Sequence, residues 1–346
     1  MLNNKNQKGM IVFIIVAVVV VLVTIFKFLM PVGEATPKEK STIKYNYRNP
    51  FSILTGRQSD STTITHLPGQ KYIARLYIEG TIQEANSTYN QDWLLETIEE
   101  LADDPFNKGI ILNVNSPGGT VYEADELYLA LLKYRGKNKP VYAYFESMAA
   151  SGGYYIACAA TKIVANRNTL TGSIGVIAGQ SLDLTGLMEK YGVKSETIHA
   201  GKNKNMGNYN EPMTDEQRQI LQSIADECYE QFTEIVANAR KMSIDKVQEL
   251  ADGRVYTAKQ ALSAGLVDSI GSFDDAEKLM EEKEFEGEDY MVEDYKYERY
   301  PNFYDYLYGL SSKIVPGKAE SITGLPEAVE KVIDPEVKYP AFIYEQ

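Results

Sequence analysis

Residues 109–119 read GIILNVNSPGG, and this stretch decides the fold. Its first part, 109–115, is a mainly apolar run of the kind found in strands that a parallel sheet buries on both faces. Its second part is a loop with paired glycines, which let a backbone come close to a ligand. The sequence therefore predicts a buried strand whose carboxyl end leads into a glycine loop, and open α/β sheets place their sites at such ends.

The sequence around this stretch alternates between strands and helices. Strands are expected at 72–80 and 140–145, and helices at 93–104 and 124–134, where apolar residues recur at helical spacing. Alternation at this spacing indicates βαβ units and a mostly parallel sheet. We therefore assign residues 71–285 to one α/β domain.

Composition excludes several classes of protein. The chain has 346 residues, of which 44% are hydrophobic and 24% charged, so it is neither wholly disordered nor a polytopic membrane protein. Its 35 basic and 48 acidic residues give a net charge of −13, which argues against a nucleic-acid partner. Cys158 and Cys228 show no metal-binding spacing and are expected to fill the core.

The N-terminus carries a candidate membrane anchor. Residues 10–26 form an uncharged run of 17 residues, longer than the apolar region of a signal peptide and without a small-residue cleavage site. We expect residues 1–30 to form a cytoplasmic tip and a single transmembrane helix in the cell membrane, and 31–70 a linker. Lys5 and Lys8 favour an extracytoplasmic domain, although Lys27 weakens this bias.

Two further segments stand out towards the C-terminus. Thr214 and Gln217 form a capping-box pattern that opens a predicted helix reaching about residue 240, with one apolar stripe for the core or for subunit packing. Residues 286–346 are assigned to an acidic, tyrosine-rich C-terminal extension. The extension is expected to be either a partly ordered tail or lid, or an acidic solubilising surface.

A second glycine loop, SMAASGGYY at 147–155, follows the strand predicted at 140–145. Ser151 precedes two glycines and an apolar run that is typical of a helix. A serine at a helix N-terminus lies in positive potential, where a developing oxyanion is stabilised. The alternative is that Ser151 is only an N-cap, a position where serine is common.

A nucleophilic serine needs a base, and the chain offers few candidates. His66 lies in the expected linker, and His199 ends a predicted strand, 195–200, with no carboxylate marked out to orient it. A lysine can serve when burial lowers its pKa. Lys202 and Lys204 lie in one polar loop, and the residues alone do not choose between them.

Several blocks in the chain resemble the signal peptide peptidases of the SppA type, which are membrane-anchored serine proteases with a Ser/Lys dyad. The blocks are NSPGG (115–119), MAASGGYYIA (148–157), TLTGSIGV (169–176), GKNK (201–204) and DGRVYTAKQALSAGLVDSIG (252–271). They occur in the family's order, and the resemblance covers about residues 71–285. It implies a ClpP/crotonase-like fold built from repeated ββα/βαβ units.

The resemblance also assigns roles to residues by position. It implies that Ser151 is the nucleophile, that Lys204 is the general base and that Ser173 orients the lysine. The backbone amides of Gly119 and Gly152 match the oxyanion hole.

This sequence departs from the family's usual pattern in the residues on either side of Lys204. Asn203 and Asn205 flank Lys204, where the family often has an aromatic residue or histidine before the lysine and serine or aspartate after it.

The implied activity is that of a serine endopeptidase. Its substrates would be apolar peptides, namely remnant signal peptides after their release from exported proteins, and also misfolded exported protein. The resemblance further implies a ring-like homo-oligomer and no metal or organic cofactor. The apolar end of the chain, residues 339–344, is suited to a substrate groove and could be trimmed there.

Two other interpretations remain open at this point. One shares the fold: a ClpP-like peptidase, for which His199 would be the only downstream histidine, or a crotonase-type acyl-CoA enzyme, which has no need of Ser151. The other is a catalytically silent, membrane-anchored ring scaffold that regulates a partner. Labelling by a serine-directed acylating inhibitor would separate the silent scaffold from an enzyme.

Overall fold

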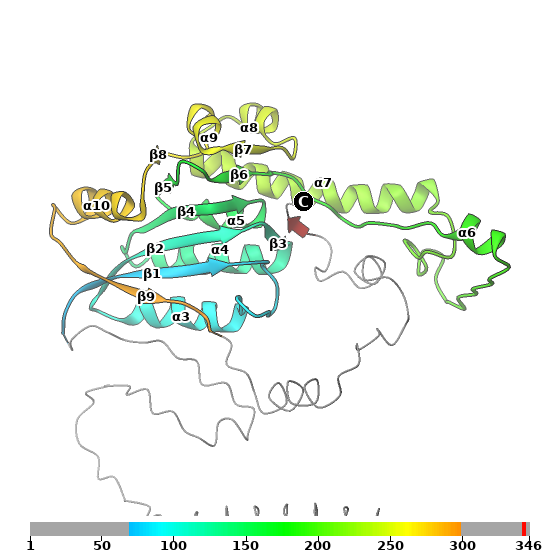
Figure 1. Ribbon diagram of the computed structural model, residues 1–346, viewed down its shortest axis with the longest axis horizontal. Helices are drawn as coiled ribbons and strands as arrows, with labels where there is room; N and C mark the ends of the chain where they lie inside the picture. The colour runs from blue at the N-terminus through cyan, green and yellow to red at the C-terminus, as the bar shows by residue number, and fades with distance from the viewer. Residues whose placement is uncertain (1–68, 299–340, 344–346) are drawn as a thin grey trace, which may run out of the picture. The chain divides into compact units, whose positions relative to one another are not determined.

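The computed structural model describes residues 69–298 and 341–343 (Figure 1). The predicted anchor, within 1–30, and all but the end of the linker lie outside these residues. Within the part of the chain that the structure describes, no helix is long and apolar enough to cross a bilayer.

A mostly parallel sheet forms the centre of the fold, as the sequence predicts. Its strands run in the order β7-β6-β4-β2-β1-β9, and β5 pairs with both β4 and β8. All of these pairings are parallel except that between β6 and β7. The strands are β1 (Tyr72–Glu79), β2 (Asn107–Ser116), β4 (Val141–Ala150), β5 (Lys162–Ala165), β6 (Leu170–Gly172), β7 (Val255–Thr257), β8 (Ser269–Ile270) and β9 (Met291–Tyr295).

Helices cover both faces of this sheet. They are α3 (Gln91–Asp103), α4 (Val121–Arg135), α5 (Gly152–Ala157), α6 (Thr185–Lys190), α7 (Asp215–Arg240), α8 (Ile244–Leu250), α9 (Ala258–Ala264) and α10 (Phe273–Glu284). The larger core lies between the sheet and α3, α4, α5 and α7. A smaller one lies under α10.

The alternation along β1 explains why the strand is apolar on both faces. Ala74, Leu76 and Ile78 belong to the larger core, whereas Ile73 packs under α10. Successive side chains of a strand point to opposite faces, so a strand covered on both faces needs apolar residues at odd and even positions. This is why the sequence carries continuous apolar runs rather than a strict alternation.

Helix α7 departs in part from the prediction. The capping box of Thr214 and Gln217 is formed, as the sequence predicts. However, the apolar stripe is buried only in the second half of the helix, where Phe232 and Val236 lie in the core, whereas Ile224 is exposed. The first half therefore extends beyond the core.

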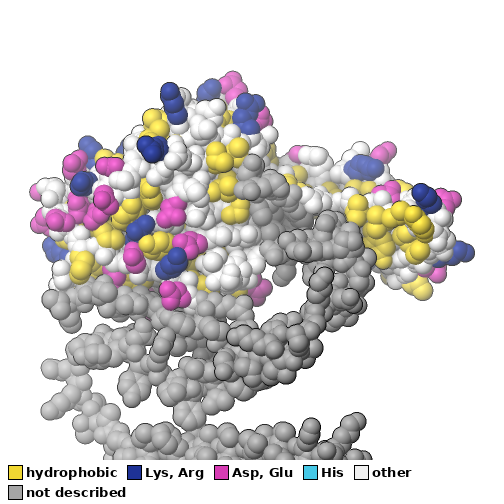
Figure 2. All heavy atoms as spheres, viewed as in Figure 1, with side chains coloured by type: hydrophobic (Ala, Val, Ile, Leu, Met, Phe, Trp, Pro, Cys, Tyr) yellow, Lys and Arg dark blue, Asp and Glu magenta, His cyan; other side chains and the backbone are white. Residues whose placement is uncertain are grey.

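Residues 177–213, here called the arm, include α6 and extend away from the sheet (Figure 1). The prediction of a strand at 195–200 is wrong, because this segment is exposed and pairs with no strand among the described residues. Hydrophobic side chains gather on the surface of the arm (Figure 2). They are Leu182, Leu187, Tyr191, Val193, Ile198 and Tyr209, all classed as exposed.

Two strands come from the predicted C-terminal extension. β9 pairs with β1 and so continues the central sheet past residue 285. β10 (Ala341–Ile343) pairs antiparallel with β3 (Gly118–Thr120), a short strand that follows β2. Residues 341–343 therefore lie beside the first glycine loop.

Candidate active site

Ser151 lies at the turn between β4 and α5, and this turn is strained. Its side chain is buried, with 1% of the residue exposed. Its backbone has φ 52° and ψ −116°, a region that L-residues rarely adopt and that costs about 1–3 kcal/mol. Although Ser151 occupies the N-cap position, its side chain makes no capping hydrogen bond, so a capping role does not account for it.

The Ser151 hydroxyl has no hydrogen-bond partner among the described residues, although its oxygen is buried. A buried hydroxyl without a partner is costly, because it has lost water and gained nothing in return. Backbone bonds hold the turn, since the Ser151 amide donates to Gly172 O at 2.8 Å and its carbonyl accepts from the Tyr155 amide at 2.9 Å. The fold thus presents a buried hydroxyl, unpaired within the described part of the chain, on a turn that backbone hydrogen bonds hold in place.

Ser173 lies beside Ser151. Ala150 of β4 pairs with Gly172 of β6, and each serine is the next residue of its chain segment. Ser173 is also buried, with φ 49°, and its amide donates to Arg254 O at 2.8 Å. Two neighbouring buried serines therefore both adopt left-handed backbone, and the structure brings together two of the predicted site residues.

The first glycine loop is held by Ser116. Its hydroxyl donates to Gly80 O at 2.6 Å and accepts from the Gly118 amide at 3.1 Å. The prediction quoted Ser116 as part of the loop but gave it no role. A hydroxyl that precedes Pro-Gly-Gly was the available signal, because serine commonly bonds the backbone of a turn.

The backbone of Gly119 faces the open edge of β3. Ile82 N donates to Gly118 O at 2.8 Å, and Thr120 N donates to Ile82 O at 2.9 Å, so both of these β3 groups face Ile82. Because the hydrogen-bonding groups of successive strand residues point to opposite edges, those of Gly119 point away from Ile82. Phe342 of β10 lies opposite Gly119 on that other edge.

The two glycine loops touch. A Cβ atom added at Gly153 would lie 3.1 Å from Ser116 O, so only glycine allows this approach without displacement. Gly152 is the first residue of α5, and the amide of a first helical residue has no acceptor within its own helix. The predicted oxyanion residues, Gly119 and Gly152, therefore lie on loops that meet at the Ser151 turn.

A tyrosine joins α5 to two other helices. The Tyr155 hydroxyl donates to Asp125 Oδ1 of α4 at 2.6 Å and accepts from Gln231 Nε2 of α7 at 2.6 Å. Burial first, and then the bond to Asp125, raise the pKa of Tyr155 well above its ordinary value, so the hydroxyl stays protonated. α7 is thus fixed one turn away from Ser151.

The predicted base, Lys204, is not brought to Ser151. Lys204 is exposed on the arm, and its ammonium group makes no hydrogen bond or ion pair with the described residues. Its neighbour Lys202 is paired with Glu216 at the start of α7, and this ammonium lowers the pKa of the Glu216 carboxyl. Asn203 also donates to Glu216, at 3.3 Å.

Contacts at two points along helix α7 show how far Lys204 lies from Ser151. The lysine-bearing loop is tied to Glu216, whereas Gln231 of the same helix bonds the tyrosine that follows Ser151. These two contacts are fifteen residues apart, which is about 22 Å of α-helix. The arm continues outward beyond that end of α7 (Figure 1), so the helix holds Lys204 and Ser151 of one chain apart.

His199 is also on the arm, where its Nδ1 lies 3.1 Å from the carbonyl oxygen of Gly201. It is exposed and makes no contact with Ser151 among the described residues. The ClpP-like arrangement, which would need this histidine beside the serine, is therefore absent from the described part of the chain.

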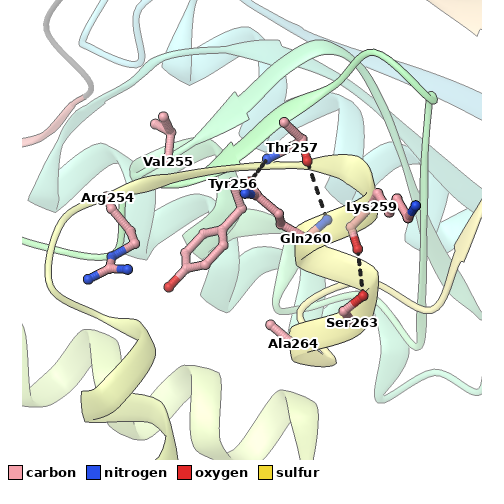
Figure 3. Close-up of a pocket in the computed structure, with 8 residues that line it drawn as sticks. All are labelled: Arg254, Val255, Tyr256, Thr257, Lys259, Gln260, Ser263 and Ala264. Atoms are coloured by element: carbon pink, nitrogen blue, oxygen red, sulfur yellow. Dashed lines mark hydrogen bonds between the residues drawn. The ribbon is translucent and has the colours of Figure 1, made fainter.

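An open hollow of about 640 Å³ lies at the edge of the sheet, between β7 and α9. Figure 3 shows that Arg254 and Tyr256 line it from the β7 segment and that Lys259 and Gln260 line it from α9. The hollow is separated from β4 by β6, and none of the predicted site residues lines it. We therefore place the candidate active site at the Ser151 turn.

The arrangement at this turn is typical of hydrolases that use a serine nucleophile. Comparisons with known proteins agree, since residues 133–285 match the description "Peptidase family S49". The "Putative signal peptide peptidase SppA" of Enterococcus faecium is 37% identical over 64% of this chain and 66% of its own length. A protein of Methanocaldococcus jannaschii that bears the name of a protease is 34% identical over 79% of this chain and 90% of its own.

The chain therefore belongs to peptidase family S49, and it is a serine peptidase. A solved structure of a membrane-bound stomatin-specific protease mutant is also similar, with 16% identity and a TM-score of 0.44. That likeness covers 66% of this chain and 98% of the other.

Proposed function

We propose that this peptidase is an endopeptidase with a Ser151/Lys204 dyad that cleaves extended apolar peptides. The observation that carries the proposal is the Ser151 turn, where a buried, strained and unpartnered hydroxyl opens a helix. Remnant signal peptides released from exported proteins are the proposed physiological substrates, together with misfolded exported protein. Their apolar segments suit a site that binds an extended peptide through hydrogen bonds to its main chain.

The pairing of β10 with β3 supports this mode of substrate binding. Residues 341–343, Ala-Phe-Ile, are apolar and lie antiparallel along the edge of β3 that Gly119 faces. A peptide that adds a strand to a sheet edge gains main-chain hydrogen bonds whatever its sequence. We propose that substrates use the same edge, so that their scissile carbonyl reaches the amides of Gly119 and Gly152.

Lys204 is the better candidate base in its loop. Lys202 is paired with Glu216, so its ammonium group is already occupied by a carboxylate. Lys204 carries no such partner among the described residues, and the two buried serines offer hydroxyl groups to an incoming amine. We propose that Ser173 orients the lysine once it has entered the site.

The separation along α7 leads us to propose that the dyad forms between two copies of the chain. Lys204 of one copy would enter the Ser151 turn of a neighbour, because its own α7 keeps it away. The exposed apolar side chains of the arm support such an assembly, since a surface of this kind is usually covered by a partner. A ring would repeat this contact, and each ring site would join two copies.

The proposed reaction follows from these positions. Uncharged Lys204 takes the proton of Ser151, and Oγ attacks the scissile carbonyl carbon. The oxyanion is held by the amides of Gly119 and Gly152, the C–N bond breaks, and Lys204 returns the proton to the leaving amine. Water, deprotonated by Lys204, then attacks the acyl carbon, the ester C–O bond breaks, and Lys204 returns the proton to Ser151 Oγ.

The remaining features are proposed from the sequence. Residues 10–26 would anchor the chain in the cell membrane with the peptidase domain outside the cytoplasm. The sheet fits the expected ClpP/crotonase-like fold, in which strands and helices repeat as βαβ units. A silent scaffold is the alternative if the site proves inert.

Complementation between two inactive variants tests the dyad and its assembly together. Ser151→Ala and Lys204→Ala chains with different tags are co-expressed, and doubly tagged oligomers are assayed on a fluorogenic apolar peptide. If each site joins two copies, random assembly restores about one quarter of the wild-type sites. Ser151→Ala co-expressed with the double variant Ser151→Ala/Lys204→Ala is the matched control and stays inactive.

Each other outcome has a distinct meaning. An inert mixture of well-assembled variants would overturn the proposal that two copies share the site. Activity in Lys204→Ala alone would remove Lys204 as the base, and Lys202→Ala provides the matched comparison. A wild type that neither cleaves peptides nor takes a serine-directed acylating inhibitor would bring forward the silent scaffold.

A further inference from the structure

The lysine loop, residues 201–210, contains an unusual buried side chain. From Gly175 to Glu216 the only residue classed as buried is Asn205, which is 6% exposed. It directly follows Lys204 in the chain. Residues 175–216 thus form no apolar core of their own, yet the side-chain amide of Asn205 is buried among them.

Three other polar side chains take part in the network around this amide. Asn205 Nδ2 donates to Asn210 Oδ1 at 3.1 Å, and Asn205 Oδ1 accepts from Asn208 Nδ2 at 2.7 Å. Asn210 Nδ2 in turn donates to Thr197 Oγ1 at 3.0 Å, on the opposite side of the arm. Because each amide acts as donor and acceptor, the network fixes the ends of the loop relative to one another.

The backbone of the loop is fixed at the same place. The Lys204 amide donates to Gly201 O at 3.1 Å, and the Met206 amide donates to Asn203 O at 3.2 Å. On the other side, Leu184 N donates to Tyr209 O at 2.9 Å and joins the loop to the start of α6. The Cα position of Lys204 is therefore held from both sides although its side chain is exposed.

From this geometry we infer that Asn205 is a positioning residue for Lys204, an inference that rests on the proposed function. The network holds the lysine backbone in one conformation before a partner arrives. Only the side-chain torsions of Lys204 then remain to be ordered in the neighbouring site. A catalytic group held in reacting geometry adds strongly to the rate, and a misplacement of about 1 Å can cost about 100-fold.

If Asn205 positions Lys204, then substituting Asn205 should change the kinetics in a way that substituting a merely structural residue would not. Without the network the loop keeps its charge and length, but Lys204 samples more positions and more water. The acylation step slows, so kcat falls while KM stays unchanged.

The test compares Asn205→Ala with Asn203→Ala in the full-length, assembled protein. Asn203 is the matched control, because it flanks Lys204 on the other side but lies outside the buried network. Rates on a fluorogenic apolar peptide are measured against substrate concentration and divided by the number of Ser151 sites that a fluorophosphonate labels. We expect Asn205→Ala to lower kcat about 10- to 100-fold with KM within about twofold, and Asn203→Ala to lower kcat less than about threefold.

A second variant keeps the inference testable if Asn205→Ala does not assemble. Asn210→Ala removes the same hydrogen bond from the other partner, and we expect the same separation of kcat from KM. The inference is overturned if both variants match Asn203→Ala, or if their activity falls only with the number of labelled sites while kcat per labelled site stays at the wild-type value.

Lys204→Ala separates failure of this inference from failure of the dyad. If Lys204→Ala is inert and Asn205→Ala behaves as the control, the dyad stands and the positioning role falls. If Lys204→Ala remains active, both fall together.

Discussion

Gly119→Ala is the substitution whose effect follows most directly from the structure. A Cβ atom at Gly119 would lie 1.8 Å from Ile82 O, 2.5 Å from Ile82 C and 2.7 Å from Ile82 Cα. All three atoms are backbone, so no side chain can rotate out of the way. Since real Cβ contacts stay above 3.0 Å, the two segments must separate by about 1.2 Å.

That displacement acts on the proposed oxyanion site. The bonds from Ile82 N to Gly118 O and from Thr120 N to Ile82 O flank Gly119, and both lengthen when the segments part. Loss of one oxyanion donor lowers kcat about 100- to 1,000-fold in well-studied peptidases. The overpacking itself should destabilise the fold by about 1–3 kcal/mol.

The assay separates these two effects. Peptide cleavage is measured per assembled chain after gel filtration, and stability is measured by urea unfolding. Gly186→Ala in α6 is the matched control, because a Cβ there meets nothing within 4 Å. A folded, assembled Gly119→Ala that keeps kcat within about tenfold of wild type would refute the role of the Gly119 amide as an oxyanion donor.

Three further predictions concern the loop, the core and the end of the chain. Ser116→Ala frees the Gly118 amide, so kcat should fall about tenfold and stability by about 1–2 kcal/mol in urea unfolding. Burial raises the pKa of Asp268, but the hydrogen bond and charge of Arg240 outweigh it and hold that pKa below its usual value. The stability it contributes is therefore present above about pH 4 and lost as the pH falls further, and Asp268→Asn should be less stable at pH 7 by about 3 kcal/mol yet show a flatter acid unfolding curve. A chain ending at Pro340 should cleave short peptides faster, because β10 no longer occupies the edge of β3, and an intact C-terminal mass in both the wild type and the nucleophile-deficient variant would argue against self-trimming.

The sequence could predict the central sheet because its signals are local. β2 and β4 each carry their own apolar run, and each is followed by paired glycines that mark close backbone approach, Gly118-Gly119 and Gly152-Gly153. The capping box at Thr214 is equally local, since its two side chains and two amides lie within one turn. The family resemblance then added roles that spacing alone left open.

The sequence could not predict features that depend on distant partners. β9 was missed because its buried residues include Glu293, whose carboxylate accepts from the Tyr295 hydroxyl at 3.2 Å, so its pattern looks like an acidic surface. The pairing of β10 with β3 joins segments more than 200 residues apart, and nothing local specifies its register. The apolar face of α7 predicted burial along its whole length, yet the half that bears Ile224 extends past the core.

The position of Lys204 is another feature that depends on distant partners, so the sequence could not predict it. This position also relates the strained backbone at Ser151 to the proposed assembly. In the proposed mechanism, Ser151 and the glycine amides need precise placement, and they lie at the buried junction of β3, β4 and α5, where packing can hold strained backbone. The base needs only to deliver and accept a proton, so an exposed loop can carry it if that loop is itself rigid. In the proposed assembly an isolated chain therefore has a nucleophile without a base, and the peptidase becomes active only where copies meet.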